Sequence, residues 1–445
     1  MKERTSWRSI GLSLVFGLIF WLYPLGIDPA MQSVLGIMAF AGAMWFTEAV
    51  PLHVTALAVP LMLVVLAGFS PADATQPFFD PVVVLLLGGF VLAVAMQKHA
   101  LDKKIAFFFI NKFGHTPGRF LLGLMAVTAF LSFWMTNTAS TALIIPIAIV
   151  VLKANNIEPL TSKYGKSVVL GVAYAATIGG MGTLIGSTPN AIAAKFLADQ
   201  GIALSFTDWM AFGLPMVIIL LPICWLLLTK FFPPPQKELK IKKQSTKLSK
   251  QQKLTLGVFA FTALLWLTTS IHGVSSSMVS IVPILLLYLL GLLATEDFAK
   301  AHWPTLILFG GGLALGTAIT MVGLDQLLAS LVVAVLNGNP TFIVFAGVAA
   351  ASIALTIFAS NTAAAAIIVP VAIPLAIGLG LPLRLLTIVA ALGVSLDFIV
   401  PVGTPPSAIA YSTGYIKVKD MAFAGTVLAV ISVAVLSTLA TLFWL

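Results

Sequence analysis

Long stretches without a charged residue are the feature that most constrains this chain. Asp, Glu, Lys and Arg are absent from segments 120–152, 167–194, 254–295, 326–383 and 421–445. A helix of about 20 residues crosses a hydrocarbon core of about 30 Å, so each segment is long enough to span a bilayer. Only 9% of the 445 residues are charged, too few to cover a soluble surface. The sequence therefore predicts an all-α polytopic membrane protein and excludes soluble enzymes and nucleic-acid-binding proteins.

Apolar segments predict about eleven transmembrane helices and two interrupted apolar stretches. The first helix follows a short basic start and has no small-residue cleavage site, so we expect it to be retained rather than removed as a signal peptide. The predicted spans are 9–27, 30–48, 53–69, 81–97, 166–198, 209–230, 254–272, 276–294, 304–322, 384–415 and 421–444, and the interrupted stretches are 118–153 and 341–379.

The distribution of basic residues predicts the orientation. If the N-terminus, with Lys2, Arg4 and Arg8, is cytoplasmic, alternating spans place all other Lys and Arg inside except Lys195 and Arg384. Cytoplasmic loops of membrane proteins are enriched in these residues. We therefore expect a multi-pass protein of the inner (plasma) membrane with the N-terminus cytoplasmic and the C-terminus outside. The lysine-rich segment 232–253 is predicted to be a flexible cytoplasmic linker that contacts membrane lipid.

The linker separates two similar halves. LLLGGFVLA (85–93) matches ILFGGGLAL (307–315), and TNTASTALIIP (136–146) matches SNTAAAAIIVP (360–370). ALDKKIA (100–106) and GSTPNAIA (186–193) match GLDQLLA (323–329) and GTPPSAIA (403–410) in the same order. We expect an N-terminal helix (1–29), repeat 1 (30–231), the linker (232–253) and repeat 2 (254–445). An odd number of spans per repeat inverts the second copy, and such inverted repeats are typical of secondary transporters.

Each interrupted stretch has a polar break between two short apolar helices. The breaks are Thr136-Asn137-Thr138 and Ser360-Asn361-Thr362. Helices of about 15 residues reach only about 22 Å, so 118–153 and 341–379 are predicted to be re-entrant hairpins with tips at membrane depth. Irregular backbone survives there only inside protein or beside a watered cavity. The tips can cap helices beginning at Ala139 and Ala363, face a ligand, or do both.

The spans 166–198 and 384–415 contain a second kind of break. Glycines and prolines interrupt both runs, and each is followed by a Thr-Pro pair, Thr188-Pro189 and Thr404-Pro405. Threonine at the N-cap with proline at the first helical position is a helix-start signal. Each run is therefore predicted to be two half-helices joined by unwound backbone, with Thr188 and Thr404 as N-caps.

Four helix N-termini, following Thr138, Thr188, Thr362 and Thr404, are expected to converge. Helix N-termini bind anions through their free N–H groups and dipoles. The motifs contain no Lys or Arg, so a bound dianion needs mobile counter-cations. Unwound carbonyls and asparagine amides are oxygen ligands suited to Na⁺ in discontinuous helices. The residues thus predict a cation-coupled anion transporter, not an enzyme, with no cofactor except Na⁺ as coupling ion. Asp397 is an acidic residue deep inside a predicted span. We expect it either to shape a cation path or to belong to a solvated cavity wall.

At these motifs the sequence resembles the divalent anion:sodium symporter family, and most of all its bacterial sodium-coupled C4-dicarboxylate members. The resemblance covers nearly the whole chain after residue 30, and implies import of succinate, malate or fumarate. It implies that the substrate is bound by Asn137, Thr138, Ser187, Ser360, Asn361, Thr362, Thr404 and Pro405. It also implies two Na⁺ sites, one at Ser132, Thr136, Asn137 and Gly186, the other at Thr356, Ala359, Asn361 and Gly403. Thr136 stands where the family usually has serine, which keeps the hydroxyl.

The resemblance further implies a homodimer and an elevator-type mechanism, in which the hairpins and broken helices slide as a transport domain. The scaffold domain would include 30–69 and 254–294, with linking helices near 98–113 and 323–338. Segment 98–113 is equally consistent with an ordinary basic helix on the membrane surface. The expected partners are a small dianion, Na⁺, membrane lipid and a second copy, with no nucleic acid. A sodium-independent dicarboxylate exchanger and a sulfate or citrate transporter remain alternatives, and an ion antiporter or an arsenite-type extruder is a more remote one.

Overall fold

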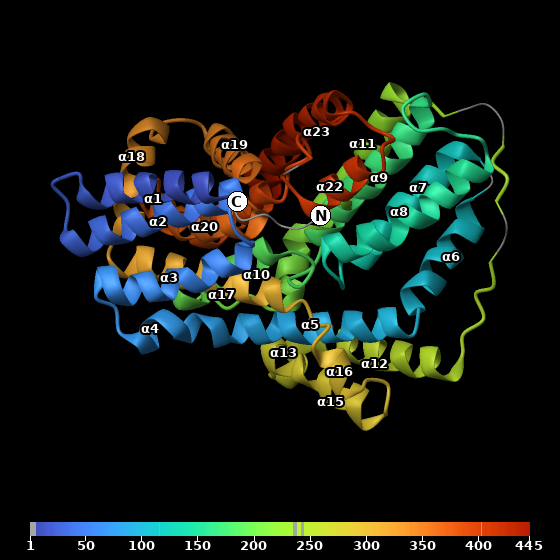
Figure 1. Cartoon of the computed structure of the whole chain (residues 1–445), viewed down its shortest axis with the longest axis horizontal. Helices are drawn as coiled ribbons and strands as arrows, with labels where there is room; N and C mark the ends of the chain where they lie inside the picture. Colours follow the sequence, from blue (N-terminus) through green and yellow to red (C-terminus); the bar gives the residue numbers. More distant parts are fainter. Residues whose placement is uncertain (1–5, 115, 235–237, 242–243, 402) are drawn as a thin grey trace.

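The computed structural model describes residues 6–114, 116–234, 238–241, 244–401 and 403–445. Every regular element in these residues is helical, which confirms the all-α prediction (Figure 1). Lys2 and Arg4 of the orientation argument lie outside the described residues, as do three of the linker lysines.

The first half of the chain forms helices at each predicted position. They are α1 (Trp7–Leu22), α2 (Pro29–Thr47), α3 (Leu52–Ala67), α4 (Pro71–Thr75), α5 (Pro81–Lys98), α6 (Leu101–Phe113), α7 (Pro117–Ser132), α8 (Asn137–Ala154), α9 (Lys163–Gly180), α10 (Thr188–Asp199) and α11 (Phe206–Phe231). A 3-10 turn, Gln76–Phe79, joins α4 to α5.

The second half repeats this order after the linker. It contains α12 (Lys250–Leu267), α13 (Thr269–His272), α14 (Ser276–Val279), α15 (Ile281–Leu289), α16 (Thr295–Phe298), α17 (Trp303–Met321), α18 (Leu324–Leu336), α19 (Thr341–Phe358), α20 (Asn361–Gly378), α21 (Leu383–Val394), α22 (Pro405–Ser412) and α23 (Val418–Leu439). A short π-helical segment, Ala440–Trp444, extends α23.

Several helices have the length and composition of membrane spans. Within the described residues, seven helical stretches are long and apolar enough to cross a bilayer, and shorter apolar helices stand beside them. Large apolar side chains project outward, such as Leu12 on α1, Leu289 on α15 and Val430 on α23. An outward apolar surface is stable when lipid covers it, as expected for a polytopic membrane protein.

The two predicted hairpins are the helix pairs α7–α8 and α19–α20. Their second helices begin at Asn137 and Asn361, two residues before the predicted starts. Thr136 and Ser360 are the N-caps of these helices. The Thr136 hydroxyl accepts a hydrogen bond from the Ala139 amide at 3.2 Å, and the Ser360 hydroxyl accepts one from the Ala363 amide at 3.3 Å. Three of the four arms have 18 residues and reach about 27 Å, which is longer than the expected 15 residues. Arm length therefore does not decide whether the hairpins re-enter, and re-entrance stays a prediction.

The predicted helix breaks separate α9 from α10 and α21 from α22. The first break is held by Asn190, whose amide nitrogen donates to the carbonyls of Gly180 (2.8 Å) and Thr183 (2.7 Å). Thr404 caps α22 as predicted and accepts from the Ser407 amide. The N-cap of α10 is Ser187 rather than the predicted Thr188, because the Thr188 hydroxyl pairs with another hydroxyl.

The broken helix of each half packs against the hairpin of the other half. Half-helix α10 packs against hairpin helix α20, and half-helix α22 packs against hairpin helix α8. Elsewhere α3 packs against α17, and α5 runs beside α12 and α15 (Figure 1). The exchange brings the two polar tips and the two unwound segments to one place in the interior.

The linker is less free than its composition predicts. Asn155, at the end of α8, donates to the Lys240 carbonyl at 3.1 Å and accepts from the Lys240 amide at 2.7 Å. Asn111 of α6 exchanges a similar pair of hydrogen bonds with the backbone of Gln244. The described part of the linker is therefore fastened across α6 and α8, which corrects the expectation of a fully flexible connection.

Candidate functional site

An interior cavity of about 260 Å³ lies where the hairpin tips and unwound segments meet. It is lined by all eight residues predicted to bind substrate: Asn137, Thr138, Ser187, Ser360, Asn361, Thr362, Thr404 and Pro405. Four separate elements of the chain supply them, two from each half. Sequence reasoning thus predicted a set of residues that the fold does bring together.

Helix N-termini surround this cavity, which we name the tip cavity. Helices α8, α10, α20 and α22 all begin at its wall. The hydroxyls of Thr188 and Thr362 lie 2.6 Å apart and connect the starts of α10 and α20. Among the described residues, no lysine or arginine lines the cavity. Helix α22 begins with two prolines, which have no N–H, and the amide of its third residue donates to Thr404. The groups available to an anion here are therefore free N–H groups at the other three helix starts, together with hydroxyls and side-chain amides.

The remaining wall of the tip cavity comes from helices outside the motifs. Leu52, Leu86, Phe90, His302 and Leu308 line it from α3, α5 and the start of α17. The His302 ring contacts the Phe90 ring edge to face, with centroids 5.6 Å apart. His302 stands at the end of a predicted span and belongs to no metal-ligand spacing pattern, so sequence reasoning did not select it as a site residue. The only available signal was its position just before α17, which does not reveal which helix it faces.

The predicted residues of the first Na⁺ site form a cluster of oxygen atoms. Asn137 Oδ1 lies 2.6 Å from Ser132 Oγ, 3.1 Å from the Ala176 carbonyl and 3.2 Å from the Gly186 carbonyl. Turned so that its nitrogen faces these three oxygens, the Asn137 side-chain amide donates to all of them. The oxygens of Ser132, Ala176 and Gly186 lie close together at this place, and oxygens of this kind are suited to Na⁺ in discontinuous helices. Thr136, the fourth predicted residue, lines the adjacent tip cavity and caps α8.

The predicted residues of the second Na⁺ site are arranged less compactly. Thr356 is buried, and its hydroxyl donates to the Val394 carbonyl at 3.1 Å. Asn361 Oδ1 is buried and has no hydrogen-bond partner in the described residues. Ala359 and Gly403 line a neighbouring cavity of about 350 Å³, which shares Ser360 and Thr404 with the tip cavity. Of the four residues, Asn361 lines the tip cavity, Ala359 and Gly403 line the neighbouring cavity, and Thr356 lines neither.

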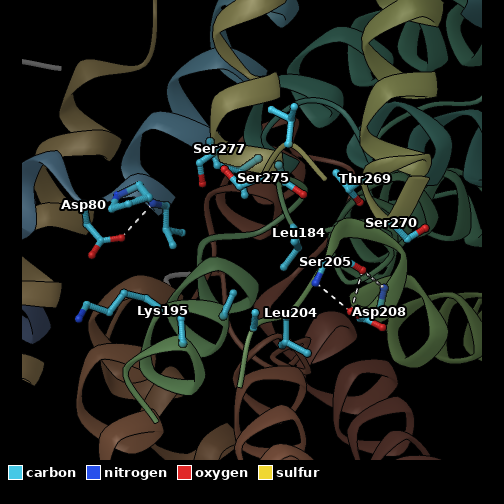
Figure 2. Close-up of a pocket in the computed structure, with 18 of the residues that line it drawn as sticks. Asp80, Leu184, Lys195, Leu204, Ser205, Asp208, Thr269, Ser270, Ser275 and Ser277 are labelled. Carbon is cyan, nitrogen blue, oxygen red and sulfur yellow. Dashed lines mark hydrogen bonds between the residues drawn. The ribbon is translucent and has the colours of Figure 1, made fainter. Parts of the chain in front are cut away.

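A larger cavity of about 630 Å³ lies between the start of α5, the end of α10, the start of α11 and the segment around α13 and α14 (Figure 2). Figure 2 shows Asp80 and Lys195 at one end and Asp208 at the other. The Lys195 amine is paired with Asp199. Of the three carboxylates at this cavity, Asp199 is paired with Lys195 and Asp208 with Arg384 at 3.4 Å, so both of these cations are already engaged. This charge balance disfavours a dianion, so the tip cavity is the better candidate for an anion site.

Comparisons with known proteins agree with one another. Residues 4–445 match the family model described as the sodium:sulfate symporter transmembrane region. The sodium-dependent dicarboxylate transporter SdcS of Staphylococcus aureus is 34% identical, over 88% of this chain and 82% of that protein. Transporters of Haemophilus influenzae (35% identical, 100% of both chains) and Methanocaldococcus jannaschii (37% identical, 99% and 100%) are also similar. The crystal structure of the Alcanivorax borkumensis YdaH transporter has a similar fold, with a TM-score of 0.61, 14% identity and 98% of both chains covered.

Proposed function

The chain belongs to the sodium:sulfate symporter family, which is also the divalent anion:sodium symporter family, and on this premise we propose that it imports C4-dicarboxylates such as succinate, malate and fumarate together with Na⁺. As a member of this family it is a multi-pass membrane transporter that is linked to sodium. The observation that carries the finer proposal is the tip cavity, where four helix N-termini meet and no lysine or arginine is present among the described lining residues.

The lining of the tip cavity suits a molecule with two separated carboxylates. Ser360 and Asn361 stand at one tip and Asn137 at the other, so each half of the chain offers its own hydroxyls and amides. One carboxylate can face the start of α8 and the other the start of α20. A volume of about 260 Å³ accommodates a four-carbon diacid with some water. The name of the S. aureus relative supports a dicarboxylate, whereas the name of the family model supports sulfate as the competing substrate.

The oxygen cluster around Asn137 supports coupling to Na⁺. The partial charges of helix N-termini and hydroxyls offset the charge of a dianion only in part, and no lysine or arginine among the described lining residues neutralises the remainder. A Na⁺ held by Ser132, Asn137 and Gly186 would place a positive charge directly beside the substrate. Substrate and cation then stabilise each other, which is the thermodynamic requirement for symport.

The remaining features of the proposal concern assembly and movement. We propose a homodimer in the plasma membrane, with the N-terminus cytoplasmic. The two hairpins and two broken helices form the transport domain, and residues 30–69 and 254–294 belong to the scaffold. Helices α6 and α18 connect the two domains. The residues of the tip cavity come from both domains, since Leu52 belongs to α3 and Asn361 to α20, so relative sliding would change access to the site.

Uptake into liposomes tests the proposal. Purified protein is reconstituted and given radiolabelled succinate under an inward gradient of Na⁺ or of K⁺. Concentrative uptake with Na⁺ alone is expected. Equal rates with both cations contradict sodium coupling, and absence of uptake with either cation contradicts the choice of succinate. Labelled sulfate in parallel vesicles separates the dicarboxylate from the competing substrate.

A pair of variants connects uptake to the proposed site. Asn361→Ala removes an amide at the second tip and is expected to abolish most succinate uptake. Asn339→Ala removes an exposed amide whose hydrogen bonds go only to α18, so its uptake is expected to equal that of the original protein. Equal uptake by both variants would place the substrate elsewhere.

A further inference from the structure

We propose that Asp397 is an anionic ligand of the second cation site, next to Asn361 and Gly403. The inference rests on the proposed sodium coupling and deepens it, because it assigns a fixed negative charge to one of the two cation sites. Asp397 follows α21 and begins the unwound segment that leads to α22.

The Asp397 carboxylate is buried, and only one of its two oxygens has a hydrogen-bond partner among the described residues. Its side chain is 1% exposed, and Oδ1 accepts a hydrogen bond from the Ile399 amide at 3.2 Å. Oδ2 has no hydrogen-bond partner and no basic partner in the part of the chain that the structure describes. A buried charge is costly unless a counter-charge or a metal ion accompanies it. The unpartnered oxygen therefore points to a cation as its missing partner.

The free oxygen of Asp397 lies against a predicted cation ligand. A Cβ atom built on Gly403 would lie 1.8 Å from Asp397 Oδ2, so the carboxylate occupies the space directly above the Gly403 backbone. Glycine is needed at position 403 for this approach, since any side chain would displace the carboxylate. Gly403 also lines the cavity that contains Ala359, another predicted ligand of the same site.

Internal comparison of the two halves gives the direction of the Asp397 side chain. Gly180 precedes the loop glycine Gly186 by the same spacing at which Asp397 precedes Gly403. A Cβ atom built on Gly180 would lie 2.3 Å from Asn137 Oδ1, so position 180 points into the oxygen cluster of the first site. The equivalent position in the second half bears a carboxylate, so by this relation we expect it to face Asn361, whose Oδ1 is likewise buried and has no hydrogen-bond partner among the described residues.

The two unwound segments are stabilised differently, which explains the need for a charge in the second. In the first, the Asn190 amide donates to two loop carbonyls. The equivalent residue in the second half is Ser407, whose hydroxyl accepts from Thr404. A cation bound by Asp397 and the loop would supply the positive charge that Asn190 provides as N–H groups in the first half. We therefore expect the second site to bind Na⁺ more tightly than the first, before substrate arrives.

The test measures cation binding without substrate. Purified protein in detergent is melted over a range of Na⁺ concentrations, with choline chloride holding the ionic strength constant. The variants are Asp397→Asn, the smaller Asp397→Ser and the control Thr387→Val. Thr387 is buried in α21 and its hydroxyl has no hydrogen-bond partner in the described residues, so the control removes a polar atom from the helix that precedes the loop.

We expect Na⁺ to raise the melting temperature of the original protein and of Thr387→Val with the same half-saturating concentration. Asp397→Asn and Asp397→Ser should raise that concentration about tenfold or more. In choline alone, Asp397→Asn should melt no lower than the original protein, because an uncompensated buried charge is removed. An unchanged Na⁺ dependence in a folded Asp397 variant overturns the role of Asp397 while leaving sodium coupling intact. If even the original protein does not respond to Na⁺, sodium coupling itself fails, and the assignment of Asp397 fails with it.

Discussion

The hydroxyls of Thr188 and Thr362 lie 2.6 Å apart, although the residues belong to opposite halves of the chain. Thr188 is the first residue of the half-helix α10, and Thr362 is in the first turn of the hairpin helix α20. Both side chains line the tip cavity. One hydrogen bond therefore joins an unwound segment of one half to the polar tip of the other, at the wall where we expect substrate.

The Thr188–Thr362 contact is expected to be energetically coupled. In a double-mutant cycle of Thr188→Val and Thr362→Val, the coupling free energy of unfolding should be about 1 kcal/mol, the usual net value of one hydrogen bond. Unfolding in mixed micelles by a denaturing detergent measures it. Thr128 donates only within α7, so the pair Thr188→Val and Thr128→Val is a control that should show no coupling. Equal coupling in both cycles would mean that the contact contributes nothing specific.

Gly180 is expected to be essential for the first cation site. The Cβ atom added by Gly180→Ala would lie 2.3 Å from Asn137 Oδ1, so the Asn137 side chain must move. We expect Na⁺-dependent succinate uptake to fall by about tenfold or more, the effect of a misplacement of about 1 Å in a preorganised site. Gly42→Ala in α2 is the matched control, because no atom of the described residues lies within 4 Å of a Cβ atom built there. Wild-type sodium dependence in Gly180→Ala would remove Asn137 from the cation site.

The hairpins and helix breaks were predictable because their signals are local. Polar tips such as Ser360-Asn361-Thr362 and helix starts such as Thr404-Pro405 act within one turn of backbone. Internal duplication added a long-range constraint, since a motif that occurs twice in order identifies equivalent places in the fold. The N-cap of α10 was misplaced by one residue for a non-local reason: Thr188 uses its hydroxyl on a helix from the other half.

The remaining parts of the site depend on packing that no short pattern encodes. His302 and Phe90 reach the tip cavity because α5 and α17 pass beside the hairpins. The attachment of the linker was missed for the same reason. Its lysines and prolines are typical of a mobile segment, whereas the hydrogen bonds that hold it come from Asn111 and Asn155, far away in sequence.

Fastening of the linker can be measured by proteolysis. In the double variant Asn111→Ala and Asn155→Ala, trypsin should cut several-fold faster at Lys240 and Lys247. The variant loses the hydrogen bonds between the linker backbone and the two side-chain amides. Loss of about 1 kcal/mol, the usual net value of one hydrogen bond, increases the population of detached linker about fivefold. Asn339→Ala serves as the control. Cleavage at the same rate in all three proteins would mean that the linker is free in solution.

His302 gives the tip cavity a titratable group with a defined pH effect. Burial of the ring in the cavity disfavours its charged form and lowers the pKa of His302 below the ordinary value of about 6.5. The unfolded chain then binds the proton more readily than the folded protein does. The stabilisation from neutral His302 is complete above about pH 6.5 and is lost as the pH falls below it, by at most about 1.4 kcal/mol per pH unit.

The variant His302→Gln isolates this effect. Melting temperatures are measured from about pH 8 to pH 5, and the original protein should lose stability below about pH 6.5 more steeply than the variant. If His302→Gln and the original protein have parallel curves, His302 binds its proton equally well in the folded and unfolded chains, and its burial in the cavity is not energetically significant.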